Sequence, residues 1–356
     1  MRFLLLCLLL MAQLPETGAA PPQFSSVTPD RKPALPGDFG AHQDFRTEWW
    51  YVTGWLQTPD GKPLGFQITF FRSATEHDAD NPSRFAPRQL IVAHAALSDP
   101  AEKKLLHGER SARQGFDLAY ARAGDTDLKL KDWRLQRKPD GSYEASVSTR
   151  DFTLQVQLQP TQAPLLQGEQ GYSRKGPQPE QASYYYSEPQ LRIGGALTRQ
   201  GKTVAVSGTA WLDHEWSSRV LDAEAIGWDW LGANLDDGSA LMAFRIRSRA
   251  GTTLWSHATL RDTAGSLKQF TAAEIDFTPL RFWQSPRGKA RYPVSMRIRT
   301  GPWQWQLTPL FDDQEFDARR STGAIYWEGA VGIGRDGAPA GRGYLEMTGY
   351  DKPMKL

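Results

Sequence analysis

The chain lacks the residues and motifs on which thiol chemistry and nucleotide binding usually depend. Its 356 residues include one cysteine, Cys7, close to the N-terminus. If the N-terminal segment is removed on export, the mature chain has no disulfide, no thiolate nucleophile and no zinc–cysteine site. The sequence contains no Gly-x-Ser-x-Gly elbow and no glycine-rich phosphate loop between a strand and a helix. It therefore supports neither a serine-hydrolase triad nor a nucleotide cofactor.

The sequence also lacks an excess of charge of one sign, and it lacks long apolar runs. Lys and Arg number 42 against 40 Asp and Glu, which gives a formal net charge of +2. This balance gives no support for nucleic acid or an anionic membrane as the main partner. No apolar run reaches the roughly 20 residues of a membrane-spanning helix. With 40% hydrophobic and 23% charged residues, the composition is that of a soluble globular protein.

The N-terminus has the pattern of an export signal. Arg2 precedes an apolar run over residues 3–11, and the small residues of segment 17–20 offer a cleavage site. A membrane anchor is the alternative, but the run is short and polar residues follow it. Cys7 lies near the start of the run rather than after it, which argues against lipidation. We expect residues 1–20 to be a cleaved signal peptide and the mature protein to be periplasmic or secreted.

Aromatic and turn residues, by contrast, are abundant, with Trp 13, Tyr 11, Phe 16, Gly 32 and Pro 24. After an extended lead-in at 21–39, apolar side chains recur at every second position in segments such as 152–158, 294–298 and 303–307. This period is typical of strands with one apolar and one wet face. Asp-Gly and similar pairs separate the segments and mark hairpin turns. The chain is therefore predicted to be all-β, in antiparallel hairpins.

The second half of the chain resembles the first. EWWYVTGWLQTPDGKPLGFQITFFRS and VAHAALSD correspond, in order, to GWDWLGANLDDGSALMAFRIRS and WSHATLRD. Later matches place Asp213 opposite Glu346. This order indicates an internal duplication, and closed barrels suit such a hairpin set because closure removes exposed sheet edges. We expect two antiparallel β-barrels packed side by side, at 40–217 and 222–352.

The histidines do not show metal-ligand spacing. No two of them are separated by two or four residues, as ligands on one strand or helix would be. His94 and His257 occupy equivalent places in the repeat, which favours a structural role for both. The six histidines are His42, His77, His94, His107, His214 and His257. We expect no metal and no cofactor.

Four segments carry a family resemblance: HQDFRTEWWYVTGWL, SEPQL, SGTAWLDHEWSS and GWDWLGANLDDG. In these segments, and in their order over essentially the whole mature chain, the protein resembles the AttH and carotenoid 1,2-hydratase (CrtC-like) superfamily. The resemblance implies two lipocalin-like barrels, export, and often an ABC permease as genomic neighbour. Members include hydratases acting on polyene chains and relatives that bind or cyclise apolar substrates, and many others carry a hydrolase label.

The segment TAWLDHEWSS is richest in candidate catalytic groups. At a strand end it would place Trp211, Asp213 and Glu215 on one face and His214 on the other. Desolvation beside tryptophan raises a carboxyl pKa, so Asp213 could act as a general acid. The resemblance supports Asp213 but implies a tyrosine two residues earlier, where this chain has Trp211. The candidate catalytic residues are Asp213, Glu215 and His214; a structural hydrogen-bond network or ligand contact are the alternatives.

The Trp-rich strands that open each barrel are candidate ligand walls. Each puts an acid beside bulky rings, which could line a site for a long apolar molecule. The alternative is that these rings fill the barrel cores. The candidate ligand-binding residues are Glu48, Trp50, Tyr185, Trp211, Trp228 and Asp229. First and last strands should pair to close each barrel, which would gather these acids and aromatic rings. We therefore expect Asp213 to contact at least one of Glu48, Tyr185 and Trp228, and to have a pKa raised by burial.

Three functions from different classes remain open at this point. The first is an exported binding protein for a lipid-like or other apolar small molecule, with an ABC permease as candidate partner. The second is an enzyme of hydratase, cyclase or hydrolase type that uses Asp213 as general acid. The third is a structural or assembly partner with filled barrels. A cavity between the barrels that reaches Asp213 would favour the first two functions.

Overall fold

The fold was analysed in a computed structural model that describes residues 24–76 and 81–354. The predicted signal peptide at 1–20 and His77 lie outside the described residues. Within the described part of the chain the secondary structure is strands apart from one 3-10 turn, η1, over Ala272–Glu274. No helix of these residues has the length and hydropathy of a membrane span. The prediction of an all-β chain is confirmed.

The first sheet is antiparallel and has the strand order β4-β3-β2-β1-β13-β12-β9-β8-β7-β6-β5, with β10 and β11 paired to β12. Its strands are β1 (Thr47–Gln57), β2 (Pro63–Ala74), β3 (Gln89–Ser98), β4 (Leu106–Arg113), β5 (Ala119–Ala121), β6 (Asp127–Leu130), β7 (Trp133–Arg137), β8 (Tyr143–Ser148), β9 (Thr153–Gln159), β10 (Leu165–Leu166), β11 (Tyr172–Arg174), β12 (Ala182–Arg199) and β13 (Lys202–Arg219).

The second sheet has the order β17-β16-β15-β14-β23-β22-β20-β19-β18, with β21 paired to β22. Its strands are β14 (Ala225–Leu235), β15 (Ala240–Ser248), β16 (Thr253–Arg261), β17 (Leu267–Phe270), β18 (Ile275–Gln284), β19 (Arg291–Thr300), β20 (Trp303–Pro309), β21 (Glu315–Ala318), β22 (Ala324–Arg335) and β23 (Ala338–Met347).

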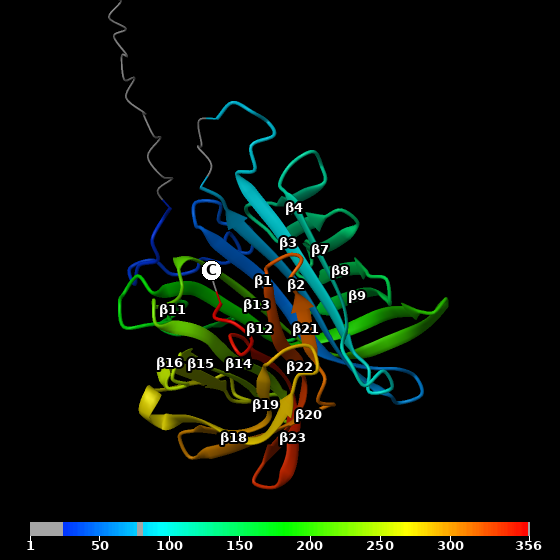
Figure 1. The fold of residues 1–356 in the computed structure, drawn as a ribbon, viewed down its shortest axis with the longest axis vertical. Helices are drawn as coiled ribbons and strands as arrows, with labels where there is room; N and C mark the ends of the chain where they lie inside the picture. The colour runs from blue at the N-terminus through cyan, green and yellow to red at the C-terminus, as the bar shows by residue number, and fades with distance from the viewer. Residues whose placement is uncertain (1–23, 77–80, 355–356) are drawn as a thin grey trace, which may run out of the picture.

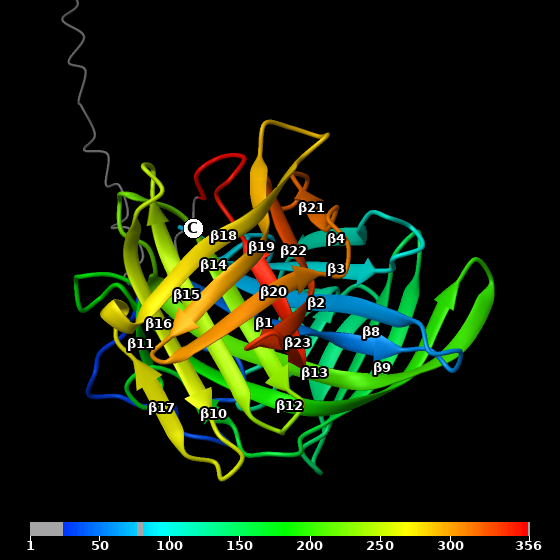
Figure 2. The same ribbon diagram turned by 90° about the horizontal axis from the view of Figure 1, so that it is seen from below.

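The two sheets repeat one topology. In the first sheet the opening strand β1 pairs with the closing strand β13, and in the second β14 pairs with β23 in the same way. Each sheet curls around its own core, and the two lie against each other (Figure 1). Seen from below, the second sheet lies in front of part of the first (Figure 2). The predicted fold class, two lipocalin-like antiparallel barrels side by side, is confirmed.

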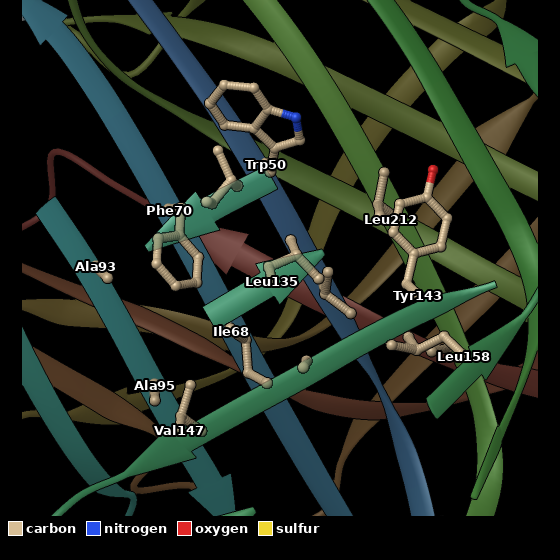
Figure 3. Packing of buried hydrophobic residues seen from close by; sticks show 14 of the residues in the cluster. Trp50, Ile68, Phe70, Ala93, Ala95, Leu135, Tyr143, Val147, Leu158 and Leu212 are labelled. Carbon is tan, nitrogen blue, oxygen red and sulfur yellow. The ribbon is translucent and has the colours of Figure 1, made fainter. Parts of the chain in front are cut away.

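The interior of the first barrel is packed with side chains. One cluster of buried residues contains Trp50, Phe70, Leu135 and Tyr143, which come from strands far apart in sequence and converge in Figure 3. Val27 and two phenylalanines of the segment before β1 belong to the same cluster. That segment therefore covers part of the first barrel instead of only leading into it. A second cluster fills the other barrel.

A third cluster lies between the barrels and explains the abundance of aromatic residues. Tyr51 and Trp55 of β1 belong to it, whereas Trp50, the residue before Tyr51, belongs to the core of the first barrel. The central strands thus bury both faces, unlike β9, where polar side chains alternate with buried ones. The expected pattern of one apolar and one wet face is correct for β9. It does not extend to β1, because a second barrel covers the outer face of that strand.

Candidate functional site

The alternation along β13 sends neighbouring side chains to opposite places. Leu212 and Trp216 belong to the core of the first barrel, and Trp211 belongs to the cluster between the barrels. Asp213 and Glu215 follow Trp211 at two-residue steps and line a cavity between the barrels. His214 points the other way, where Trp50 stacks on it with ring centroids 4.4 Å apart. One strand therefore serves two separate polar sites.

The cavity between the barrels has a volume of about 110 Å³ and mainly apolar walls, which include seven aromatic side chains. Both sheets contribute to it, and Val220 and Leu221 come from the segment that joins β13 to β14. Its acidic and basic side chains are three carboxyls and one ammonium. The lining residues are Thr47, Trp49, Tyr51, Thr69, Phe71, Lys175, Asp213, Glu215, Val220, Leu221, Trp228, Trp230, Phe244, Ile246, Tyr326 and Glu346.

Asp213 is held by three donors. Its Oδ1 accepts hydrogen bonds from the Ser187 hydroxyl at 2.6 Å and the Trp211 indole N–H at 2.6 Å. Its Oδ2 accepts one from the Tyr185 hydroxyl at 2.9 Å. Burial raises the pKa of Asp213 to about 7, although these bonds oppose the shift. The expected contact with Tyr185 and the raised pKa are both present.

Tyr185 connects Asp213 to the second barrel. Its hydroxyl accepts a hydrogen bond from the Trp230 indole N–H at 3.1 Å while it donates to Asp213. Burial, together with the charges of Asp213 and Glu215, raises the pKa of Tyr185 well above its ordinary value. The phenol therefore stays neutral, and its hydroxyl remains available to exchange donor and acceptor roles with the carboxyl of Asp213.

Glu215 forms the one ion pair among the groups that line this cavity. Its Oε1 lies 2.8 Å from Lys175 Nζ, and both side chains are almost fully buried. Lys175 also donates to the Ser173 hydroxyl at 3.0 Å. The ion pair leaves Asp213 and Glu346 without a cationic partner in the cavity lining.

Glu346 is the counterpart of Asp213 in the second barrel. It lies on the closing strand β23, and its Oε2 accepts a hydrogen bond from the Trp228 indole N–H at 3.1 Å. Burial, aided by the charge of Glu215, raises the pKa of Glu346 to about 7. Glu328 is paired with it across β22 and β23 and accepts a hydrogen bond from the Tyr51 hydroxyl at 2.8 Å. Burial and the charge of Glu346 raise the pKa of Glu328 well above its ordinary value.

Inside the first barrel, Glu48 has a different environment. Its Oε1 lies 2.7 Å from His42 Nδ1 and 2.8 Å from His214 Nε2, and its Oε2 accepts a bond from Arg72 Nε at 2.8 Å. Burial alone would raise the pKa of Glu48, but the hydrogen bonds from His214 and His42 and the charge of Arg72 lower it well below its ordinary value. Burial lowers the pKa of His214 to about 4 despite its bond to Glu48.

His42, Glu48 and His214 also form a candidate cation site, which the spacing of the histidines in the sequence did not reveal. The facing atoms of His42, Glu48 and His214 lie within 4.8 Å of one another. However, the guanidinium of Arg72 already neutralises Glu48, and His42 Nε2 is engaged with Asp38 at 3.1 Å. A second positive charge would be repelled by Arg72. The donor set therefore fits a structural hydrogen-bond network better than a metal.

The structure gathers some of the sequence-predicted residues and separates others. Asp213, Glu215, Trp211, Tyr185 and Trp228 meet at or beside the cavity. Of the four other predicted residues, Glu48, Trp50 and His214 lie on the inner face of the first barrel.

Asp229 likewise points into the second barrel instead of the cavity. Its carboxylate lies 2.7 Å from Arg245 Nε and 3.2 Å from Arg247 Nε. Asp229 and Trp228 are adjacent on β14, so they cannot share a face. The two residues therefore cannot line the same wall of a ligand site, although both are among the residues predicted from the sequence to bind a ligand.

Sequence reasoning missed several cavity residues. The predicted ligand-binding set includes Trp50 but omits Trp49 and Tyr51. Both faces of β1 carry aromatic side chains, so the alternation along the strand does not reveal which face meets the cavity. Glu346 was visible as the counterpart of Asp213 in the repeat, a signal that could have found it. Lys175, in the connection between β11 and β12, had no signal in the sequence.

Comparison with known proteins supports this arrangement. A family model described as AttH-like matches residues 26–350. The solved structure of a candidate AttH protein from Nitrosomonas europaea is 58% identical, has a TM-score of 0.87, and the match covers 92% of this chain and 100% of that one. None of the curated proteins matches this chain in sequence.

Two more distant solved structures share the fold. Kievitone hydratase from Nectria haematococca is 14% identical with a TM-score of 0.68, over 93% of this chain and 98% of that one. CghA is 14% identical with a TM-score of 0.53, over 94% of this chain and 98% of that one. The family model, which spans nearly the whole described chain, decides the identity: this protein belongs to the AttH-like family.

Proposed function

We propose that the protein binds a small, mainly apolar molecule in the cavity between its barrels. The observation that carries this proposal is the aromatic cavity itself, which both barrels build and whose wall includes Asp213. Ligand sites are typically apolar pockets with a few convergent polar groups. The barrel interiors, by contrast, are packed with side chains. A purely structural role would not account for an apolar space beside buried ionisable groups.

The cavity volume limits the ligand. About 110 Å³ is below the roughly 300–1,000 Å³ of sites for drug-sized molecules. A long polyene does not fit this volume. The ligand is therefore small, or a larger one enters by displacing Val220 and Leu221, which lie on the segment between the two sheets and not on a strand.

A pair of matched substitutions tests this binding. Val220→Trp fills the cavity, whereas Val204→Trp adds the same ring at an exposed site on β13. With 3,3-dimethylbutan-1-ol as a neutral probe, calorimetric titration should show binding by the wild type and Val204→Trp and a loss of about tenfold or more for Val220→Trp. Native mass spectrometry of freshly purified protein should show the same order for any co-purified ligand. Equal binding by all three proteins would contradict the proposal.

The second candidate function is acid catalysis of the hydratase type, and the protonation of Asp213 favours it. With a pKa of about 7, Asp213 holds a proton in much of the protein at neutral pH. It could protonate one carbon of an alkene while water attacks the other carbon and returns a proton to Asp213. Trp211 cannot relay protons, but the Tyr185 hydroxyl stands at Asp213 in its place. One structure of this fold is a hydratase, kievitone hydratase.

Isotope exchange separates catalysis from binding. If the protein is a hydratase, ligand recovered after incubation in D₂O should carry carbon-bound deuterium. Asp213→Asn should abolish this incorporation and keep the ligand bound. Bound ligand without deuterium in the wild type would leave the binding function and exclude catalysis by Asp213.

We also propose export across a membrane through a cleaved signal peptide, with an ABC permease as candidate partner. Arg2, the apolar run at 3–11 and the small residues at 17–20 support this route. N-terminal sequencing of the exported protein should give a start close to residue 21. An exported protein that keeps Met1 would contradict cleavage.

A further inference from the structure

The cavity between the barrels is lined by more acidic than basic side chains. Asp213, Glu215 and Glu346 line it, and Lys175 is its one lining cation among the described residues. The ion pair between Lys175 and Glu215, at 2.8 Å, uses that cation. Two carboxyl groups remain in an apolar surrounding with only neutral donors, namely a serine, a tyrosine and two indoles. Ionised carboxylates in such a place are costly unless a positive charge arrives.

The aromatic walls already hold an ammonium group. Lys175 Nζ lies 4.4 Å from the ring centroid of Phe244 and 4.8 Å from that of Tyr185. These distances are within the range of cation–π attraction, which strengthens when the cation is desolvated. Trp228 and Trp230 line the same space near the two uncompensated carboxyls. Aromatic faces combined with carboxylates are the chemistry that recognises organic ammonium groups.

We propose that the ligand of this cavity is a free, small organic ammonium compound whose cationic group lies against Asp213 and Glu346 and whose apolar part contacts the tryptophans. This inference rests on the proposed binding function and adds the charge of the ligand. It differs from simple apolar binding because the positive charge, and not the hydrocarbon alone, supplies affinity.

The proposal requires proton release on binding. The titratable groups whose charges act on one or both carboxyls are Glu215, Tyr185, Glu328, Tyr51 and Tyr326. Lys175 is paired with Glu215 and lies near His257. Burial and nearby Lys175 lower the pKa of His257 to about 4, so this histidine is neutral at pH 7. A bound cation favours the ionised forms of Asp213 and Glu346, whose pKa is about 7 in each free site. Affinity should therefore rise with pH up to about 8 and then level off.

Choline and its uncharged isostere 3,3-dimethylbutan-1-ol are the probes that test the charge. Calorimetric titration of the full protein should show choline binding at least about tenfold more tightly than the alcohol. Choline affinity should increase between pH 6 and pH 8 by about tenfold for each carboxyl that ionises, and so by about a hundredfold for the two, whereas the affinity for the alcohol should stay constant. The heat measured in two buffers of different ionisation enthalpy should reveal release of about one proton.

Three variants complete the test. Asp213→Asn and Glu346→Gln should each weaken choline binding by about tenfold and leave the alcohol unaffected. Glu328→Gln is the matched control: it removes an acid whose raised pKa already keeps it neutral, so both affinities should persist. Thermal melting of each variant confirms folding, and Glu346→Gln serves alone if Asp213→Asn does not fold.

The outcomes separate this inference from the proposed function. Equal binding of choline and the alcohol, or choline binding that ignores both carboxyl substitutions, would overturn the ammonium ligand and leave apolar binding intact. If neither probe binds at any pH, both proposals fail for molecules of this size. Preference for choline that is lost in Asp213→Asn and Glu346→Gln but kept in Glu328→Gln supports the inference.

Discussion

Asp213 and His214 are neighbours on β13, yet they belong to two buried sites of opposite character. On the inner face, His214 joins Glu48, which the guanidinium of Arg72 neutralises. On the outer face, Asp213 lines the cavity between the barrels with only neutral donors. The pKa of Glu48 is held well below its ordinary value, whereas burial raises that of Asp213 to about 7. A buried carboxylate with a cationic partner indicates a structural ion pair. A buried carboxyl with only neutral donors indicates a site that can take up a proton or a cation.

The largest expected effect breaks the matched site. Arg72→Met leaves Glu48 ionised in a fully buried place and also removes bonds to the carbonyls of His42 and Phe45. Loss of one partner of a buried pair costs about 3–5 kcal/mol, so the free energy of unfolding should fall by that amount. Urea denaturation measures it. Arg46→Met, at a half-exposed arginine, is the control and should change stability by less than about 0.5 kcal/mol.

The next effect distinguishes the two sites by pH. Asp213 has a higher pKa in the folded protein than the ordinary value of 3.8, so the folded state binds the extra proton. Stability from this group is complete below about pH 4 and is lost as pH rises to about 7, by up to about 4 kcal/mol. Glu48 acts in the opposite direction, because its lowered pKa makes stability fall only in acid.

Denaturation curves between about pH 5 and pH 8 measure this slope. Asp213→Asn should flatten it, and the variant should be relatively more stable than the wild type at the alkaline end. Glu346→Gln should remove the part of the pH slope that Asp213→Asn leaves, because the pKa of Glu346 is also raised to about 7. A wild-type slope that both variants keep unchanged would mean that the cavity carboxyls titrate normally.

The smallest expected effect concerns the donor to Glu346. Trp228→Phe keeps the ring in the cavity wall and removes the N–H that donates to Glu346 at 3.1 Å. Loss of one such bond should cost about 1 kcal/mol and raise the pKa of Glu346 further, because the bond favours the ionised carboxyl. Thermal unfolding at about pH 8 should show the loss. Trp228→Phe at about pH 5, where Glu346 is protonated, is the internal control and should differ less from the wild type.

Much of the architecture could be predicted from the sequence because it depends on periodic patterns. The two-residue period of segments such as 152–158 gives strands, and the repeat pairs Asp213 with Glu346 before any fold is known. The family resemblance then identifies the barrels. The pairing of first and last strands, β1 with β13 and β14 with β23, follows from closure and is observed.

The membership of the site could be predicted only in part. Parity places Asp213 and Glu215 on one face of β13, but on β1 both faces are aromatic, and the register of Tyr51 opposite Asp213 decides which one meets the cavity. That register depends on tertiary pairing, not on local pattern. Histidine spacing likewise missed the approach of His42 to His214, since the two come from segments distant in sequence.

A direct titration of Asp213 tests the central claim, that the cavity carries unmatched carboxyls. Carbon-13 NMR of side-chain carboxyls, with Asp213→Asn to assign the resonance, follows its protonation from about pH 3 to pH 9. A midpoint near 7 is the result expected from burial without a cationic partner. A midpoint near the ordinary value of 3.8 would contradict the claim, because Asp213 would then be ionised and compensated throughout the neutral range.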